Sequence, residues 1–249
     1  MLLGAAEIMV TGACSSTPSA PVDSANGRST APLGGVPLSG WKLTLPVADS
    51  GRKAKIIDPA AVTAPWLARD GAGNLAFWAP ARGVTTFHSD HPRTELDSRT
   101  EFRAGSSIHN LRASLSVTQL PDKSKKIIVG QMHGAGSISS VPFVMVVYDS
   151  GALDVVVKQK QSGSEGNRDS LLSNVPLGAT FDYKITDNGD GSLRFTATYG
   201  STTNMRKVAL PASFSDAAVR FQAGDYQQDD VDEDPSDSGR VVFTALSAD

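Results

Sequence analysis

Cysteine is nearly absent from this chain: Cys14 is the only one in 249 residues, so no internal disulfide can form. The fold must therefore be held by side-chain packing and hydrogen bonds. No run of about 18 apolar residues occurs, which excludes a transmembrane helix. Basic residues (23) do not outnumber acidic ones (26), so the chain lacks the basic excess typical of nucleic-acid-binding proteins. A polyanion remains a possible ligand only if basic residues gather in one groove.

The motifs of several common chemistries are also missing. There is no Walker loop, no glycine-rich dinucleotide turn and no nucleophile elbow. The four histidines are not spaced like metal ligands, and we expect no metal site. The segment His88 to His91 is a weak metal candidate that is better interpreted as a surface loop.

The N-terminal segment resembles an export leader. Residues 1–13 are mostly apolar and precede Cys14, as at the end of a bacterial lipoprotein signal, although Glu7 interrupts the apolar run and a basic start is missing. We expect residues 1–14 to be a signal or lipoprotein leader, with Cys14 as the lipid attachment point; the alternative is a disordered leader with an incidental cysteine. The protein would then be secreted or periplasmic.

Composition divides the rest of the chain into a linker and one domain. Residues 15–36 are rich in Ser, Thr, Pro, Ala and Gly, which predicts a flexible linker that buries no core. We expect a single folded domain over residues 37–249 and a monomer.

Short segments of alternating or β-branched residues dominate this domain. Hairpin turns are predicted at Asp149 to Ala152 and at Asp187 to Gly191, and brief helical turns at Pro59 to Leu67 and at Pro211 to Asp216. The absence of β-α-β alternation predicts an all-β antiparallel sandwich, and the size favours a jelly roll with a substrate groove on the concave sheet. The expected strands cover residues 41–45, 75–79, 99–103, 111–119, 126–133, 143–148, 153–159, 181–186, 193–199, 219–226 and 240–246.

Three distant segments place polar side chains two residues apart on predicted strands, so that these side chains share one face. The first, His91 to Arg103, presents Arg93, Glu95, Asp97, Arg99, Glu101 and Arg103 at alternate positions, and alternation of this kind is by itself more typical of a solvated face with ion pairs. The second presents Gln131 and His133, although a lone strand histidine is more often structural. The third presents Gln222, Gly224, Tyr226 and Gln228, where Gly224 would leave a gap for a ligand. Lys158 and Lys160 share a face and would add charge to a groove or form a solvated edge.

The three segments resemble the signature regions of the alginate lyases of polysaccharide lyase family 7. The family patterns R-[ST]-E-L-R, Q-[IV]-H and Y-F-K-A-G-x-Y-N-Q stand here, in the same order, as RTELD, QMH and RFQAGDYQQ. The resemblance covers about residues 38–249 and also includes the strand WKLTLPV. It implies a β-jelly roll and β-elimination of a uronic-acid polymer such as alginate.

The resemblance assigns roles residue by residue. Arg93 and Gln131 match the groups that neutralise the substrate carboxylate, and His133 and Tyr226 match the proton-transfer pair. Glu95 and Gln228 match further motif positions, and with Arg99, Arg103, Lys158, Lys160 and Gln222 they form the predicted substrate-binding set. Arg93 and Gln131 would stabilise the dianion formed when C5 loses its proton. A base and an acid would then complete the elimination, without a metal or organic cofactor.

Three positions depart from the family motifs. Asp97 replaces an arginine, Gln222 a lysine and Gln227 an asparagine. Two of these changes remove positive charge where a polyanion should bind, and Met132 matches neither usual residue at its position.

From the resemblance as a whole we expect an endolytic alginate lyase that leaves a 4,5-unsaturated uronate. The alternatives are a lyase for another polyuronate such as glucuronan, or a non-catalytic carbohydrate-binding sandwich.

Overall fold

The computed structural model describes residues 36–59, 64–231, 234 and 236–249. The predicted leader and nearly all of the predicted linker lie outside these residues. The linker was predicted to end at residue 36, but Val36 is only 2% exposed and packs in the hydrophobic core. Its carbonyl accepts a bond from Arg69 Nη2 at 2.6 Å, so Val36 belongs to the folded domain.

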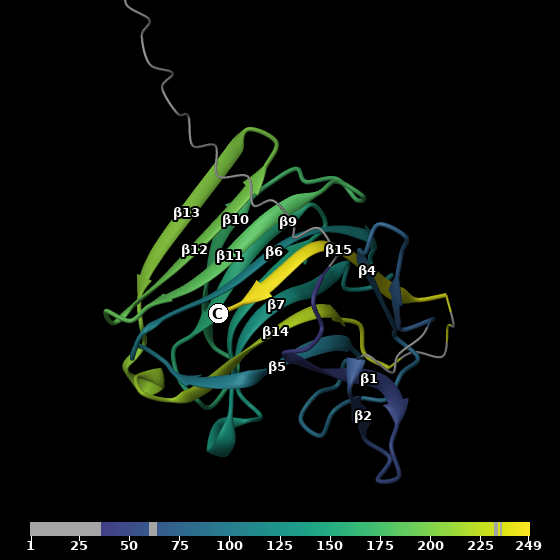
Figure 1. The fold of residues 1–249 in the computed structure, drawn as a ribbon, viewed down its shortest axis with the longest axis horizontal. Coiled ribbons are helices and arrows are strands. Elements are labelled where there is room, and N and C mark those ends of the chain that lie inside the picture. The colour runs from purple at the N-terminus through teal and green to yellow at the C-terminus, as the bar shows by residue number, and fades with distance from the viewer. Residues whose placement is uncertain (1–35, 60–63, 232–233, 235) are drawn as a thin grey trace, which may run out of the picture. The chain divides into compact units, whose positions relative to one another are not determined.

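Two antiparallel β-sheets account for almost all regular structure in the described residues (Figure 1). One sheet has eight strands, in the order β10 (Gly166–Leu172), β9 (Ala152–Lys158), β8 (Pro142–Asp149), β7 (Lys126–Gly134), β14 (Ala218–Gln227), β5 (Thr94–Arg103), β1 (Trp41–Ala48) and β2 (Ala54–Ile57). The other has seven, in the order β13 (Thr202–Ala209), β12 (Ser192–Tyr199), β11 (Phe181–Asn188), β6 (Ile108–Gln119), β15 (Ser238–Ala248), β4 (Leu75–Pro80) and β3 (Leu67–Arg69).

The predicted antiparallel sandwich is therefore confirmed, and every predicted strand is present. The turn predicted at Pro211 to Asp216 contains a short 3-10 helix, η3 (Ala212–Phe214), and a second one, η2 (Gly136–Ile138), follows β7. The helical turn predicted at Pro59 to Leu67 falls partly outside the described residues, and its last residue begins β3 instead.

Four strands were not predicted from the sequence. They are the four edge strands of the two sheets: β2, β10, β3 and β13. An edge strand has one neighbour and much exposed surface, so it needs no regular apolar face. The strand β13 illustrates this, because none of its residues is buried. Buried positions, by contrast, alternate clearly along central strands such as β6.

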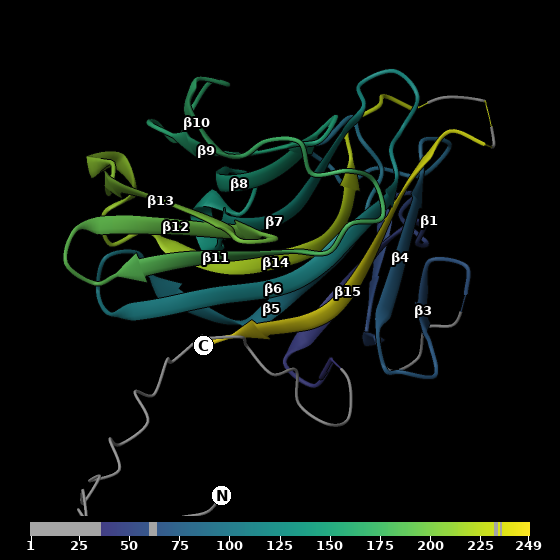
Figure 2. The ribbon, with the colours of Figure 1, turned by 90° about the horizontal axis from the view of Figure 1, so that it is seen from above.

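The core fills the space between the two sheets, which Figure 2 shows from above. Leu96, Met132 and Phe221 come from the three central strands of the larger sheet and belong to this core. Because side chains alternate along a strand, their neighbours in sequence point to the opposite face. The larger sheet therefore presents its polar residues on the face that points away from the smaller sheet.

Two hydrogen bonds tie the centre of the larger sheet to β4 of the other. The Asp225 carboxylate accepts the Ala79 N–H at 3.1 Å, and the Thr94 hydroxyl donates to the Trp78 carbonyl at 2.7 Å. Burial raises the pKa of Asp225 well above its ordinary value. These bonds hold β14 and β5 from the inner side of the larger sheet, opposite the polar face.

Gly224 allows β14 and β5 to lie close together at this point. A Cβ at Gly224 would lie 2.5 Å from the Thr94 carbonyl oxygen and 2.8 Å from Glu95 Cα. The sequence predicted that this glycine would leave a gap for a ligand. That interpretation was wrong, because the backbone of the neighbouring strand occupies the space.

Candidate active site

The four predicted catalytic residues meet at one pocket on the outer face of the larger sheet. This pocket has a volume of about 340 Å³, and Arg93, Gln131, His133 and Tyr226 all line it. They come from β7, β14 and the residue directly before β5, which are adjacent in the sheet although far apart in sequence. In Figure 1, β14 lies between β7 and β5. Gln222, predicted to bind substrate, lines the same pocket.

Arg93 is a buried cation with unused hydrogen-bonding capacity. It is 7% exposed, and its Nη1 donates to Glu95 Oε2 at 3.0 Å. Its Nε is buried without a hydrogen-bond partner among the described residues. A buried donor without an acceptor is energetically costly, and an anion entering the pocket would supply that acceptor.

The guanidinium of Arg93 also stacks on Tyr226. Its Cζ lies 3.4 Å from the centroid of the Tyr226 ring. A cation in this position is attracted by the negative face of the aromatic ring, so the contact holds the two side chains together. Arg93 and Tyr226, which the sequence placed in two separate motifs, are therefore in direct contact.

Glu95 lies below the pocket rather than in it. Its side chain is fully buried, and its two oxygens accept bonds from Arg93 at 3.0 Å and from Gln131 Nε2 at 2.6 Å. Burial raises the pKa of Glu95, while the Arg93 charge opposes that rise. The prediction that Glu95 binds substrate needs correction, because its carboxylate has no exposed surface and instead holds Arg93 and Gln131 in place.

Gln131 begins a hydrogen-bonded chain that crosses the sheet. Its Nε2 donates to Glu95 and also to Gln222 Oε1 at 3.0 Å, and its own Oε1 is buried without a partner among the described residues. Gln222 in turn donates to Asp97 Oδ1. Asp97 also accepts the Thr44 hydroxyl at 2.9 Å. Two of the three motif departures, Asp97 and Gln222, are therefore bonded to each other.

Arg220 supplies a second cation to the pocket, and the sequence analysis missed it. Its Nε lies 3.2 Å from Asp97 Oδ1, and its Nη1 donates to the Gly134 carbonyl at 3.0 Å. Asp97 stands on β5 where the family motif has an arginine, whereas Arg220 lies on the adjacent strand β14. Arg220 therefore returns one of the two missing positive charges to the pocket, on the neighbouring strand and paired with Asp97.

His133 is neutral at physiological pH. Its Nδ1 lies 3.1 Å from the Gly134 carbonyl oxygen, which can only accept, so Nδ1 carries the proton and Nε2 does not. Burial lowers the pKa of His133 to about 4, and the nearby charges of Arg93 and Arg220 act in the same direction. An unprotonated nitrogen in the pocket can accept a proton.

The Tyr226 hydroxyl is held by a residue outside the predicted motifs. Its oxygen lies 2.8 Å from Ser89 Oγ. Ser89 Oγ also donates to the His91 carbonyl at 3.0 Å and accepts the His91 N–H at 3.1 Å. With its single hydrogen directed at His91, Ser89 accepts from Tyr226; by rotating, it can donate to a phenolate. The sequence predicts a surface loop for His88 to His91, and it gives no sign that Ser89 contacts Tyr226.

The remaining predicted substrate-binding residues do not line this pocket. Gln228 Nε2 donates to the backbone carbonyls of Tyr226 and Gln227, both at 3.1 Å. Arg99 and Arg103 are exposed and donate to the carbonyls of Trp41 and Asp216.

Neither predicted lysine lies at the pocket. Lys158 is 7% exposed and donates to the Gly163 carbonyl at 2.6 Å, so its ammonium is engaged by its own loop. Lys160 is exposed just after β9, two strands away from β7.

The strand β5 explains part of this separation. Its pairing with β14 shifts between Arg220 and Gln222, which face Glu101 and Asp97. Two more residues therefore lie on β5 than on β14, and three consecutive residues, Arg99 to Glu101, are exposed. The predicted single charged face is interrupted at this irregularity.

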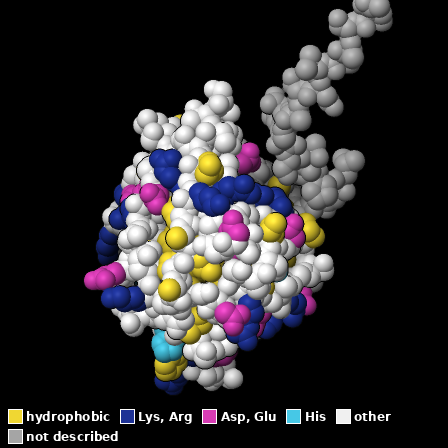
Figure 3. All heavy atoms as spheres, turned by 90° about the vertical axis from the view of Figure 1, so that its left-hand side faces the viewer, with side chains coloured by type: hydrophobic (Ala, Val, Ile, Leu, Met, Phe, Trp, Pro, Cys, Tyr) yellow, Lys and Arg dark blue, Asp and Glu magenta, His cyan; other side chains and the backbone are white. Residues whose placement is uncertain are grey.

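Although the net charge of the chain is −3, charged side chains are not evenly distributed over the surface. Basic and acidic side chains both lie on the face shown in Figure 3, where the basic ones form a row.

No group of three or more His, Cys, Asp or Glu side chains in the described part of the chain is placed to hold a metal ion. Within the same residues, no helix is long and apolar enough to cross a membrane.

The comparisons with known proteins agree with this geometry. The family model described as alginate lyase matches residues 36–249. No curated protein sequence matches the chain. Among solved structures, alginate lyase A1-II′ of polysaccharide lyase family 7 is 28% identical, with a TM-score of 0.74 over 88% of this chain and 98% of that chain. Alginate lyase PA1167 from Pseudomonas aeruginosa is 26% identical, with a TM-score of 0.75 over 86% of this chain and 99% of that chain.

A variant of A1-II′ has been solved in complex with a substrate, GGMG. It is 27% identical to this chain, with a TM-score of 0.75 over 88% of this chain and 96% of that chain. The family match spans the whole described domain, including the three segments that form the pocket. The chain therefore belongs to the alginate lyase family.

Proposed function

We propose that this polysaccharide lyase cleaves alginate within the polymer chain by β-elimination, with Arg93, Gln131, His133 and Tyr226 as its catalytic residues. One observation carries the assignment. A buried arginine with an unpartnered Nε is stacked on a tyrosine ring, beside a neutral histidine, in one pocket. That arrangement joins an anion site to two groups that can transfer protons.

The substrate carboxylate binds to Arg93 and Gln131. Arg93 offers its unpartnered Nε, while its Nη1 remains on Glu95. Gln131 donates one amide hydrogen to Glu95 and one to Gln222, and the substrate carboxylate replaces Gln222 as the second acceptor. These donors are held in position before substrate binds, so they stabilise the dianion that forms at C5 without further reorganisation.

Proton transfer completes the reaction. A base removes the C5 proton, the electron pair forms the C4=C5 double bond, the C4–O bond breaks, and an acid protonates the leaving oxygen. Tyr226 serves as acid, and also as base where its phenolate is stabilised by Arg93 and Ser89. His133, unprotonated at Nε2, is the base for the opposite C5 configuration. The product carries a 4,5-unsaturated uronate at its new non-reducing end.

The polymer substrate also bears on location and assembly. Alginate is too large to enter a cell intact, which supports a secreted or periplasmic protein, with Cys14 as lipid anchor in the predicted leader. We propose that the domain acts as a monomer, because the four catalytic residues all come from one chain. Cell fractionation and size-exclusion chromatography test these two statements.

The decisive experiment follows the ultraviolet absorbance of the unsaturated uronate. The purified protein is mixed separately with polymannuronate, polyguluronate and glucuronan. A rise with either alginate polymer supports the proposal and gives the uronate preference. A rise with glucuronan alone would support a lyase for another polyuronate.

The variant Tyr226→Phe separates a lyase from a binding module. It removes the phenol proton but keeps the ring on which Arg93 stacks. We expect turnover to fall by roughly 10²- to 10⁴-fold while polymer binding is retained. Binding by the wild type without turnover on any of the polymers would favour the non-catalytic carbohydrate-binding module.

A further inference from the structure

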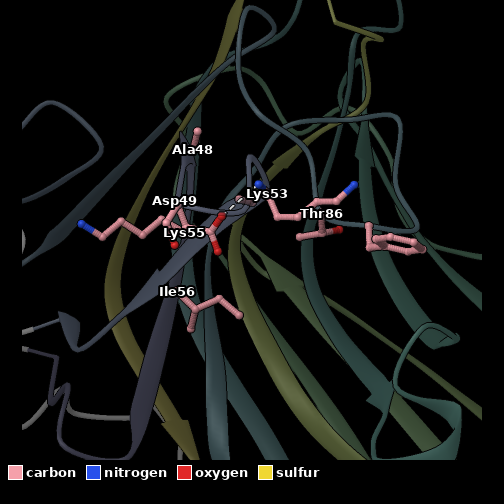
Figure 4. A pocket seen from close by; sticks show the side chains of 9 residues that line it. Ala48, Asp49, Lys53, Lys55, Ile56 and Thr86 are labelled. Carbon is pink, nitrogen blue, oxygen red and sulfur yellow. Dashed lines mark hydrogen bonds between the residues drawn. The ribbon is translucent and has the colours of Figure 1, made fainter.

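A second cavity of about 640 Å³ continues from the catalytic pocket. The two cavities share Ile56, Thr86 and Phe87 in their walls. The second cavity lies between the β1–β2 hairpin and the segment that contains Phe87, and Figure 4 shows the side chains around it. None of the predicted substrate-binding residues lines it.

Two large apolar side chains are exposed where the cavities join. Phe87 is 72% exposed and Ile56 is 59% exposed. Exposed apolar residues are common singly, but two together along a cleft indicate a surface that is covered when a ligand binds. The apolar C–H face of a sugar ring suits such a surface.

The ammonium group of Lys53 lies beside this apolar surface. Lys53 Nζ lies 4.4 Å from the centroid of the Phe87 ring. Lys53 forms no ion pair within the described residues. The nearest acid in the cavity wall, Asp49, uses its Oδ1 to accept the backbone N–H groups of Gly51 at 2.8 Å and Lys53 at 3.0 Å. Asp49 therefore closes the hairpin turn.

Orientation distinguishes the two lysines of the hairpin. The Lys53 ammonium lies over the Phe87 ring, and in Figure 4 the Lys55 side chain runs in the opposite direction from that of Lys53. Lys53 is thus the cation that a ligand lying on Phe87 and Ile56 would meet. Thr86 adds a hydroxyl to the same wall.

We propose that Lys53, Ile56 and Phe87 form a distal subsite for one more uronate of the same polymer chain. The apolar face of its ring lies on Phe87 and Ile56, and its carboxylate pairs with the Lys53 ammonium. This inference rests on the proposed function, because continuity with the catalytic pocket identifies the occupant. The subsite increases affinity for long chains and takes no part in the chemical step.

The test compares substrates of different length. Phe87→Ala and Lys53→Gln are assayed by absorbance on the long polymer and on a series of short oligomers, the shortest of which ends before the subsite. Matched controls, Met205→Ala and Lys207→Gln, change an exposed apolar residue and an exposed lysine on β13 of the other sheet. Phe87→Trp tests whether another aromatic residue preserves the subsite.

We expect KM on the long polymer to rise about five- to tenfold in both test variants, with kcat unchanged. On the shortest cleaved oligomer, both variants should match the wild type, and Phe87→Trp should match it on every substrate. High salt should reduce the defect of Lys53→Gln but not that of Phe87→Ala, since only the first is electrostatic.

Two results would overturn the subsite. One is a KM on the long polymer equal to that of the control variants. The other is an equal loss on short and long substrates, because Phe87 lies two residues from Ser89 and such a loss would mean that the substitution disturbs Tyr226. Failure of the proposed function is distinguishable, since the wild type itself would then release no unsaturated product. Calorimetric binding of intact polymer to wild type and Phe87→Ala would still test the subsite in that case.

Discussion

Burial of His133 should make the stability of this protein depend on pH in a way that one substitution removes. The folded state lowers the pKa of His133 to about 4 from an ordinary value of 6.5. The unfolded chain therefore binds a proton at a higher pH than the folded chain does. Stability is fully present above the unfolded pKa and is lost as pH falls from 6.5 toward 4.

The magnitude follows from the difference between the two pKa values. Each pH unit within the window costs up to about 1.4 kcal/mol of unfolding free energy. His133 is only 8% exposed, so solvent screens this effect little. Between about pH 7 and about pH 5 the wild type should lose about 2 kcal/mol through His133 alone.

Urea denaturation of the wild type and of His133→Asn at both pH values measures this contribution. Burial gives Glu95 and Asp225 raised pKa values, which act in the opposite direction, but both carboxyls are present in both proteins. The difference between the two pH dependences therefore isolates His133, with His88→Asn as a control at an exposed position. Equal pH dependence in wild type and His133→Asn would refute the reasoning that His133 is buried neutral beside Arg93 and Arg220.

Three further substitutions probe the site and its support. Ser89→Ala removes the hydroxyl held against the catalytic phenol, and we expect kcat to fall roughly tenfold with little change in KM; an unchanged kcat would contradict a positioning role. Gly224→Ala places a methyl group against the backbone of β5 and should destabilise the domain by about 1–3 kcal/mol in urea denaturation, whereas Gly71→Ala, where nothing lies within 4 Å, should not. Glu95→Gln removes the charged acceptor of Arg93 and should lower kcat/KM about tenfold or more; wild-type kinetics would show that Arg93 holds its position without it.

The regular spacing of charged and apolar residues was enough to predict the central strands. A central strand must bury one side, so its side-chain period of two is visible in the sequence. The edge strands β2, β3, β10 and β13 have no such obligation, and the sequence analysis missed all four. The same physics explains both outcomes.

The four proposed catalytic residues could be named from the sequence because each belongs to a local motif in or beside a strand. Arg93, Gln131, His133 and Tyr226 were each named from the sequence, and the structure brings all four to one pocket. Their proximity depends on the order β7-β14-β5, which joins segments far apart in the chain. No local pattern encodes that order.

Contacts between residues far apart in the sequence could not be predicted from local patterns. Ser89 contacts Tyr226 across 137 positions of sequence, and Arg220 meets Asp97 across 123. Glu95 was placed on the correct face, but only the packing around it decided that it lies beneath the pocket rather than in it.

The sequence by itself therefore determined the strand periodicity and the sandwich class, and it named the four proposed catalytic residues, because these depend on patterns of neighbours along the chain. Tertiary structure decided which polar groups line the pocket, which of them hold others in place, and that Arg220 of β14 joins them. Those properties depend on strand register and on burial, which arise only when distant segments pair.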